Sequence, residues 1–257
     1  MPAVGNGAYG FNGEVIVVTG GAMGIGAGIA EVLAEAGAMV VIADSNGSKA
    51  GEVAEGLRQA GHAADHIEVD VSLENSIVRA WAALCERHGA PWGLVNNAGI
   101  QDRQLLLDGT AEEWDRVNAV NSRGVFLLTR EAARGMVAAG NGGRIVHVAS
   151  AALIGALTQG HAVYASSKAA LLGLMRAAAL ELVQHGITVN TVLPGGVATP
   201  GAIGAQGPVP EGPGRRSPPL GMCGPRDIGA AVLFLASPMA RSVTNQAFAV
   251  DGGWSVT

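Results

Sequence analysis

The feature of this sequence that most constrains its fold is an alternation of short apolar runs with longer alanine-rich stretches. The short runs, such as residues 15–18, are continuously apolar and rich in β-branched side chains, which favours buried strands. The longer stretches, such as residues 25–36, space their apolar positions as helices do. Buried strands separated by helices predict an α/β fold in which a parallel sheet is covered on both faces.

The alternation also gives the order of the elements. We expect strands at residues 15–18, 39–43, 67–69, 93–96, 144–149, 188–193 and 246–250, and helices at 25–36, 48–60, 73–88, 112–139, 162–184 and 226–235. No internal repeat or linker interrupts it, so we predict a single domain over residues 13–257 after a short extension at residues 1–12. The Gly/Pro-rich segment at residues 200–219 follows a strand and is predicted to be a substrate loop.

Composition narrows the possible partners. The formal net charge of −5 argues against nucleic acid or an anionic membrane as the main partner. Charged residues make up only 14% of the chain, against about 25% in soluble domains, so we expect copies of the chain to cover part of the surface in a homo-oligomer. Residues 1–12 lack the features of a signal peptide and no apolar run is long enough to span a membrane, which predicts a soluble cytoplasmic protein.

The residues that commonly bind metals or form disulfides show no such pattern here. Cys85 and Cys223 are isolated, and the six histidines have no metal-ligand spacing. We therefore predict no metal site. His147 lies within an expected strand and is predicted to be a hydrogen-bonded core residue.

A glycine-rich segment at residues 19–26 follows the first expected strand and opens the first expected helix. Glycine permits a tight turn and a close approach to a pyrophosphate, whose charge is stabilised at the helix N-terminus. The strict GxGxxG pattern is absent because Ile29 occupies its last position. The place of the segment between a strand and a helix still predicts a dinucleotide site that includes Gly20, Gly24 and Gly26.

Asp44 ends the second expected strand, where a carboxylate can accept hydrogen bonds from adenosine ribose hydroxyls. A carboxylate there would repel a 2′-phosphate, and Lys49 is the nearest cation in the sequence. These features favour NAD over NADP. Further contacts to the cofactor are expected from residues that end the third and fourth strands: Asp70, Val71, Asn97, Ala98 and Gly99.

Tyr164 and Lys168 lie four residues apart at the start of an expected helix and so share one helix face. Tyrosine, with a reference pKa of about 10, is a poor base near neutral pH, but an adjacent cation lowers that pKa. Tyr164 is thus a candidate acid/base for an alcohol proton. Ser150 ends the strand at residues 144–149 on the same sheet edge, and Asn121 places a polar side chain within the expected helix 112–139.

Together these motifs resemble the short-chain dehydrogenase/reductase family in its compact form, over nearly the whole chain from Thr19 to Gly253. The resemblance includes the segments at residues 194–199 and 251–253. It implies a Rossmann-type, doubly wound parallel sheet of about seven strands, a nicotinamide cofactor and a homotetramer. It also implies hydride transfer between the cofactor and a secondary alcohol or ketone.

The resemblance assigns a role to each matching residue. Tyr164 would be the general acid/base, and Lys168 would bind the nicotinamide ribose and lower the pKa of Tyr164. Ser150 would orient the carbonyl, and Asn121 would hold a water that links Lys168 to solvent. The resemblance adds further residues to the expected cofactor site, namely Met23, Ile25, Pro194, Gly195, Val197 and Thr199, together with Tyr164 and Lys168 themselves.

One spacing departs from the family pattern. Ser150 precedes Tyr164 by fourteen residues, and Ala151 occupies the spacing of thirteen that close relatives show. We expect a one-residue insertion in the intervening loop, with Ser150 as the catalytic serine.

Other functions compete with an NAD-dependent alcohol dehydrogenase. A ketoacyl-carrier-protein reductase usually takes NADP and docks its carrier on a basic patch, so Asp44 and the negative net charge argue against it. An enoyl reductase of this fold spaces its Tyr and Lys more widely. A non-catalytic nucleotide-binding regulator commonly lacks the Tyr or the Lys.

The substrate is the least constrained part of the prediction. Leu153, Ile154 and Val163, near the tyrosine, predict a mainly apolar pocket for a small hydrophobic or cyclic secondary alcohol. His161 and Gln101 are further candidates for lining that pocket.

Overall fold

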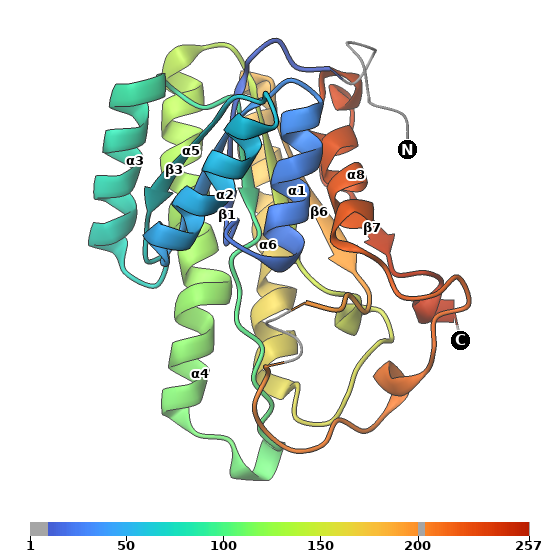
Figure 1. The fold of residues 1–257 in the computed structure, drawn as a ribbon. Coiled ribbons are helices and arrows are strands. Elements are labelled where there is room, and N and C mark those ends of the chain that lie inside the picture. Colours follow the sequence, from blue (N-terminus) through green and yellow to red (C-terminus); the bar gives the residue numbers. More distant parts are fainter. Residues whose placement is uncertain (1–9, 200–203, 257) are drawn as a thin grey trace.

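The computed structural model describes residues 10–199 and 204–256, in which seven parallel strands form a sheet between two layers of helices (Figure 1). The strand order is β3-β2-β1-β4-β5-β6-β7. The strands are β1 (Val15–Thr19), β2 (Met39–Asp44), β3 (Ala64–Glu68), β4 (Gly93–Asn96), β5 (Gly143–Val148), β6 (Ile187–Pro194) and β7 (Ala247–Val250). This confirms the predicted doubly wound α/β fold and its number of strands.

Helices cover both faces of the sheet. Helices α1, α2 and α8 pack on one face and α3, α5 and α6 on the other, while α4 continues below the sheet (Figure 1). Their bounds are α1 (Gly24–Glu35), α2 (Gly47–Gln59), α3 (Glu74–His88), α4 (Ala111–Asn118), α5 (Val125–Ala139), α6 (Ala162–Leu182) and α8 (Pro225–Ala236). Shorter helical turns are η1 (Leu106–Asp108), η2 (Ala119–Gly124), η3 (Ala151–Leu153), η4 (Val183–His185), η5 (Pro213–Arg215), η6 (Pro238–Ala240) and η7 (Trp254–Val256).

The two helical layers explain why the strands are apolar at successive positions. Side chains along a strand point alternately to the two faces of the sheet. Ile16 and Val18 accordingly join the core beneath α1 and α8, whereas Val17 joins the core beneath α3, α5 and α6. Because both faces are buried, every position of the strand requires an apolar side chain.

The long helix predicted at residues 112–139 is present from Ala111 to Ala139, but it contains a π-helical turn that was not predicted. The chain forms α4, a π-helical turn η2 and then α5. Gly124 explains part of this π-helical turn, since a Cβ atom there would lie 2.4 Å from the carbonyl oxygen of Val71. Asn121 explains the rest, because its side chain is hydrogen-bonded to Ile100 on a different segment.

The third strand also differs from its prediction. It begins at Ala64, three residues earlier than expected, and ends at Glu68. It pairs with β2 from Val40↔Ala64 to Asp44↔Glu68. The polar residues Asp65 and His66 conceal its start in the sequence, because an edge strand does not need a continuous apolar run.

The remaining predicted bounds lie within two residues of those observed. Residues 1–9 of the expected extension and 200–203 of the expected substrate loop lie outside the described residues. Within the described part of the chain, no helix is long and apolar enough to cross a membrane.

Candidate active site

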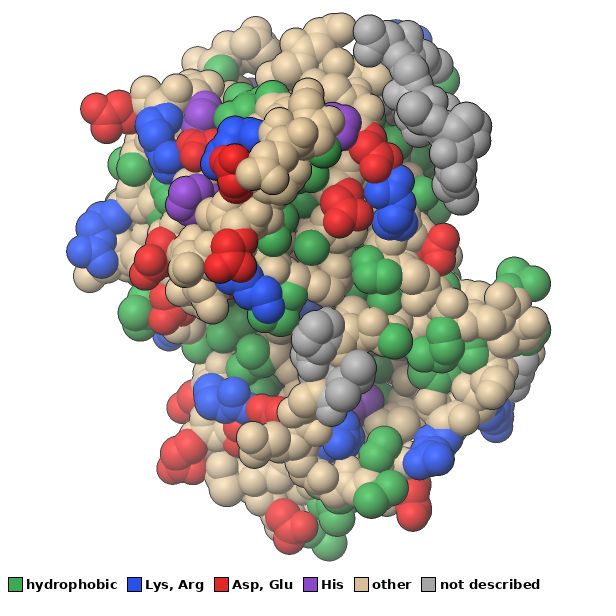
Figure 2. All heavy atoms as spheres, viewed as in Figure 1, with side chains coloured by type: hydrophobic (Ala, Val, Ile, Leu, Met, Phe, Trp, Pro, Cys, Tyr) green, Lys and Arg blue, Asp and Glu red, His purple; other side chains and the backbone are tan. Residues whose placement is uncertain are grey.

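A cavity of about 880 Å³ opens at the carboxyl ends of the strands. It lies where β1 stands between β2 and β4 and the strand order reverses, which is where open α/β sheets bind ligands. Figure 2 shows a hollow across the middle of this face, between the upper layers and the lower loops. All the predicted catalytic and cofactor-binding residues line the cavity except Asn121, which is fully buried.

The glycine-rich turn fits a bound pyrophosphate. A Cβ atom on Gly26 would lie 2.1 Å from the Gly20 carbonyl oxygen, and one on Gly20 would lie 2.8 Å from Ala98 Cα. The backbone therefore closes so tightly here that larger residues would not fit. Helix α1 begins directly after Met23, which makes no capping hydrogen bond with its side chain. The N–H groups of the first helical turn can therefore bind an anion.

Asn97 holds this turn to the end of β4. Its Nδ2 atom donates to the carbonyl oxygens of Thr19 and Gly20 at 2.9 and 3.1 Å. The Thr19 hydroxyl accepts from the backbone N–H groups of Asn97 and Ala98. The Asn97 amide therefore positions the turn, although the residue also lines the cavity.

Asp44 lies at the end of β2 beside the glycine turn. Its two carboxylate oxygens accept hydrogen bonds from the backbone N–H groups of Ala22 (3.1 Å) and Asn46 (3.0 Å). No ion pair of Asp44 occurs among the described residues. A negative charge is thus fixed at one end of the cavity.

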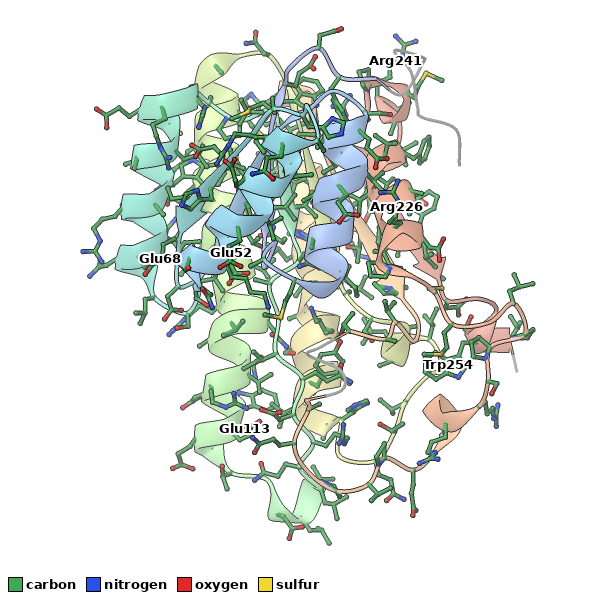
Figure 3. All side chains as sticks on the ribbon, viewed as in Figure 1. Glu52, Glu68, Glu113, Arg226, Arg241 and Trp254 are labelled. Atoms are coloured by element: carbon green, nitrogen blue, oxygen red, sulfur yellow. The ribbon has the colours of Figure 1, made fainter. Side chains whose placement is uncertain are left out.

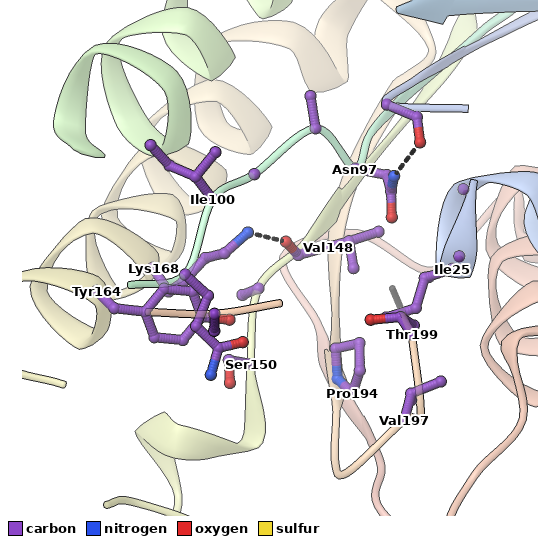
Figure 4. Close-up of a pocket in the computed structure, with 18 of the residues that line it drawn as sticks. Ile25, Asn97, Ile100, Val148, Ser150, Tyr164, Lys168, Pro194, Val197 and Thr199 are labelled. Carbon is purple, nitrogen blue, oxygen red and sulfur yellow. Dashed lines mark hydrogen bonds between the residues drawn. The ribbon is translucent and has the colours of Figure 1, made fainter. Parts of the chain in front are cut away.

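Tyr164 and Ser150 lie at the other end of the cavity (Figure 4). Tyr164 extends from the first turn of α6 and is only 9% exposed. Burial raises the pKa of Tyr164, and a hydrogen bond with Ser150 acts in the opposite direction. The two hydroxyls are therefore close enough to bind one substrate oxygen together.

Lys168, one turn further along α6, is buried and donates a hydrogen bond to the Val148 carbonyl oxygen at 2.9 Å (Figure 4). Burial lowers the pKa of Lys168 to about 8. Its Nζ atom lies 6.0 Å from the Tyr164 ring centroid. Burial dominates the pKa of the phenol here while the ammonium group is hydrogen-bonded to Val148, so the effect of Lys168 on Tyr164 stays a prediction.

The segment between Ser150 and Tyr164 begins with the turn η3. The Ser150 Oγ atom accepts a hydrogen bond from Ala152 N at 3.1 Å and so caps this turn. Ala151 is buried at its start. Ser150 consequently faces Tyr164 despite the altered spacing.

Asn121 lies behind the catalytic pair in the π-helical turn η2. Its side chain accepts from Ile100 N and donates to Ile100 O, both at 2.9 Å, and donates to Ser167 Oγ at 3.0 Å. A Cβ atom on Gly99 would lie 3.1 Å from Lys168 Nζ and 3.3 Å from Asn121 Oδ1. The backbone at Gly99 thus approaches both groups closely.

The comparisons with known proteins agree with this geometry. A family model described as enoyl-(acyl carrier protein) reductase matches residues 20–255. The chain is 41% identical over 247 residues to a 2,5-dichloro-2,5-cyclohexadiene-1,4-diol dehydrogenase of Sphingobium indicum, covering 95% of this chain and 97% of the relative. It is 40% identical over 251 residues to a cis-4-hydroxycyclohexanecarboxylate dehydrogenase of Sinomonas cyclohexanicum, covering 95% and 98%.

The structural likeness is equally extensive. A short-chain type dehydrogenase/reductase from Mycobacterium marinum superimposes with a TM-score of 0.88 at 32% identity, covering 97% of this chain and 98% of that one. The chain belongs to the short-chain dehydrogenase/reductase family. As a short-chain dehydrogenase/reductase it is an oxidoreductase that uses a nicotinamide cofactor, and its relatives include dehydrogenases named for two cyclic alcohols and for sorbitol.

The substrate end of this dehydrogenase/reductase differs in part from the prediction. His161 and Gln101 line the cavity as expected, and their Nε2 atoms are 3.1 Å apart. Leu153, Ile154 and Val163 do not line it, so that part of the prediction was wrong. Leu153 and Ile154 lie at the end of the turn η3, whereas Val163 lies in the first turn of α6.

Sequence reasoning missed several residues of the cavity wall. Trp254 and Met222 pack where Gly196 leaves room for them, since a Cβ atom there would lie 2.8 and 2.4 Å from their nearest atoms. Figure 3 shows Trp254 beside the loops on the C-terminal side of the molecule. Arg103 also lines the cavity, six residues after Asn97. Only its closeness to the Asn97–Gly99 motif in the sequence could have indicated it.

His147 was predicted to be a fully hydrogen-bonded core residue, and this was only partly correct. Its Nδ1 atom lies 3.1 Å from Asn96 Nδ2, but its Nε2 atom has no partner among the described residues. Burial, with a smaller effect of the nearby Lys168 charge, lowers the pKa of His147 to about 3. The His147 ring is therefore neutral at physiological pH.

The described residues contain no group of three or more His, Cys, Asp or Glu side chains arranged to hold a metal ion.

Proposed function

We propose that this protein interconverts a secondary alcohol and a ketone with NAD(H), and that its substrate is a hydrophobic or cyclic alcohol. The observation that carries the proposal is a single cavity with the Asp44 carboxylate at one end and the Tyr164–Ser150 pair at the other. The bound nicotinamide would accept hydride from the alcohol or supply it to the ketone.

The catalytic roles follow from the contacts of each side chain. The Tyr164 hydroxyl exchanges a proton with the substrate oxygen, and Ser150 holds that oxygen by a second hydrogen bond. Lys168, positioned by the Val148 carbonyl, supplies positive charge that favours the phenolate as the proton leaves. Asn121 fixes the Ile100 backbone, and a water beside it and Lys168 would connect the lysine to solvent.

The preference for NAD rests on Asp44. Backbone N–H groups hold its carboxylate rigidly at the end of β2, where it can accept hydrogen bonds from ribose hydroxyls. A 2′-phosphate in the same place would meet a like charge. The cofactor phosphates would lie at the N-terminus of α1, with Gly20, Met23, Gly24, Ile25 and Gly26 beside them.

The apolar character of the substrate is supported by the cavity wall and by the relatives. Around the catalytic pair the wall includes Ala151, Ala152, Ala156, Met222 and Trp254. Two relatives at 40% identity or more are named for oxidation of alcohols on six-membered rings. A ring alcohol of that size is the substrate we expect here.

This function can be tested with a panel of cyclic secondary alcohols. The protein is mixed with each alcohol and with NAD or NADP, and the absorbance of the reduced cofactor is measured. We expect NAD reduction with at least one cyclohexanol and loss of that activity in Tyr164→Phe. No turnover of any alcohol by a folded protein that binds NAD would contradict the proposal and favour a non-catalytic regulator. Turnover confined to ketoacyl thioesters with NADPH would favour the carrier-protein reductase.

The role of Asp44 has its own test. Asp44→Asn keeps the shape of the side chain but removes its charge, so we expect the NAD-to-NADP ratio of kcat/KM to fall about 10- to 100-fold. Asp115→Asn, on the exposed α4 helix outside the cavity, is the matched control. An unchanged ratio in Asp44→Asn would remove this residue from cofactor selection.

We also propose a homo-oligomer, with the tetramer as the expected form. Large apolar side chains remain exposed on α5, α6 and the turn after it, including Phe126 (50%), Leu180 (79%) and Val183 (54%). Contact between copies would cover them. A native mass equal to that of the 25.8 kDa monomer would contradict this.

A further inference from the structure

Arg103 is a charged residue of the cavity wall that the catalytic roles leave unused. It lies on the segment that follows β4, near His161 and Gln101. Its side chain is held in place by the loop after β6, since Nε donates to Pro208 O at 2.9 Å and Nη2 to Ala205 O at 3.1 Å. The guanidinium group is therefore fixed at the substrate end of the cavity.

The acceptors that hold Arg103 are neutral carbonyl groups. No carboxylate of the described residues forms an ion pair with Arg103. The neighbouring Asp102 also lines the cavity, but one oxygen pairs with Arg116 at 2.5 Å and the other accepts from Gln206 N at 3.0 Å. Arg116 bonds Glu113 as well, so Asp102, Arg116 and Glu113 carry one net negative charge, which the Arg103 charge balances. An anionic ligand would therefore be attracted only where it directly contacts the Arg103 guanidinium group.

The polar side chains on the His161 side of Arg103 are uncharged. His161 is buried, and burial together with Arg103 lowers its pKa, which keeps the ring neutral at pH 7. The His161 ring is held between Gln101 Nε2 and Thr158 Oγ1. A ligand that enters this end of the cavity therefore meets an unpaired guanidinium between neutral polar groups.

We propose that Arg103 is a carboxylate-binding subsite, and that the alcohol substrate is a ring compound with one anionic group. The inference rests on the proposed function, because it requires the substrate to occupy the cavity beside Tyr164. A guanidinium binds a carboxylate through paired, charge-assisted hydrogen bonds, which are stronger than bonds between neutral groups. A single cation at this end suits one carboxylate and not a polyanion.

Direct binding tests this proposal without requiring turnover. Cyclohexanecarboxylate and its neutral counterpart cyclohexanecarboxamide are titrated calorimetrically into the full-length protein, with and without NADH, at low and high NaCl. We expect the carboxylate to bind about tenfold more tightly than the carboxamide, and this preference to decrease with salt.

Variants separate the charge of Arg103 from its contacts with the loop. Arg103→Gln should abolish the preference. Arg103→Lys keeps the charge but replaces the separate donors Nε and Nη2 by a single nitrogen, and it should retain most of the preference. Arg134→Gln, at an arginine that is 66% exposed outside the cavity, should leave the preference unchanged.

Three results would overturn the subsite: equal binding of the two ligands, binding of neither, or a preference that persists in Arg103→Gln. Equal loss in Arg103→Lys and Arg103→Gln would also overturn it, because the effect would then come from the loop. Oxidation of uncharged cyclohexanols alongside any of these results would leave the proposed function intact.

Discussion

A buried cationic side chain lies at the carboxyl end of the strands of the sheet, and another lies at their amino end. The surroundings of these two cations differ. Lys168 lies at the carboxyl end of the strands and Arg144 at the start of β5, and they are 4% and 5% exposed. Neither forms an ion pair with a carboxylate of the described residues. Carbonyl oxygens are their hydrogen-bond partners in both places.

Arg144 is surrounded on all sides by protein. Its guanidinium donates to Gly143 O at 2.8 Å and to Ser237 O, at the end of α8, at 3.3 Å. The Trp92 ring covers it at 4.8 Å. A positive charge near a helix C-terminus is favourable, so this residue stabilises the closed end of the sheet.

Lys168 has one carbonyl partner and faces the cavity. Its pKa of about 8 lets it change charge within the range in which enzymes work, whereas arginine stays protonated. The comparison teaches that burial of a cation does not by itself indicate function. Lys168, which we propose acts in catalysis, differs from Arg144 in the open space beside it and in its pKa of about 8.

Among variants that test the difference between Lys168 and Arg144, we expect the largest effect from a change of Lys168, and we expect it on the rate of catalysis. Lys168→Met should lower kcat by about 10²- to 10⁴-fold, because Tyr164 loses the charge that favours its phenolate. The fold should persist, since a desolvated ammonium is replaced by an apolar chain of similar length. Turnover of a cyclic alcohol measures the loss, and Lys49→Met at the chain's other lysine is the control. Undiminished turnover in Lys168→Met would contradict a catalytic role for Lys168 and would leave no functional difference between Lys168 and Arg144.

Arg144→Met should have the converse effect. It leaves the Gly143 and Ser237 carbonyls without their donor, which we expect to lower the free energy of unfolding by about 3 kcal/mol. Catalysis per folded molecule should be unchanged. Urea unfolding measures the stability, with Arg134→Met on the surface of α5 as the matched variant. A loss of activity without a loss of stability would contradict a structural role.

Lys168 should also make stability depend on pH. Its pKa is about 8 in the folded state and 10.5 in the reference state, so the penalty of burying its charge is complete below pH 8. The penalty disappears as the pH rises to 10.5. The unfolding free energy of the wild type should therefore rise relative to Lys168→Met across that window, by on the order of 3 kcal/mol. Parallel pH profiles of the two proteins would refute the shifted pKa.

The smallest expected effect comes from Trp92. Trp92→Phe removes the hydrogen bond from its Nε1 atom to Ala236 O at 3.2 Å and weakens the contact with Arg144. We expect a loss of about 1 to 2 kcal/mol of unfolding free energy. In a double-mutant cycle with Arg144→Met the two losses should not add, and full additivity would show that the ring does not stabilise the guanidinium.

Features of the structure could be predicted from the sequence where they depend on residues close together in the chain, and not where they depend on contacts between distant segments. The glycine turn, Asp44 and the Tyr164–Lys168 pair were identified because the constraint on each lies in a short local pattern. The π-helical turn was not, because it depends on contacts of Gly124 with Val71 and of Asn121 with Ile100, which lie 53 and 21 residues away. Arg103 and Arg144 were missed for the same reason, since their partners are on distant segments.

The π-helical turn η2 has a consequence for how this chain can change in length. Such a turn holds one residue more than an α-helical turn, so it takes up the extra residue while the helix after it keeps its rotation. Deleting one residue from Ala119–Gly124 should therefore give a regular helix whose buried α5 face still meets the sheet, but in which Asn121 loses its contacts with Ile100. Inserting a residue into α5 itself, where no π-helical turn takes it up, should instead rotate every later side chain by about 100° and expose the buried face.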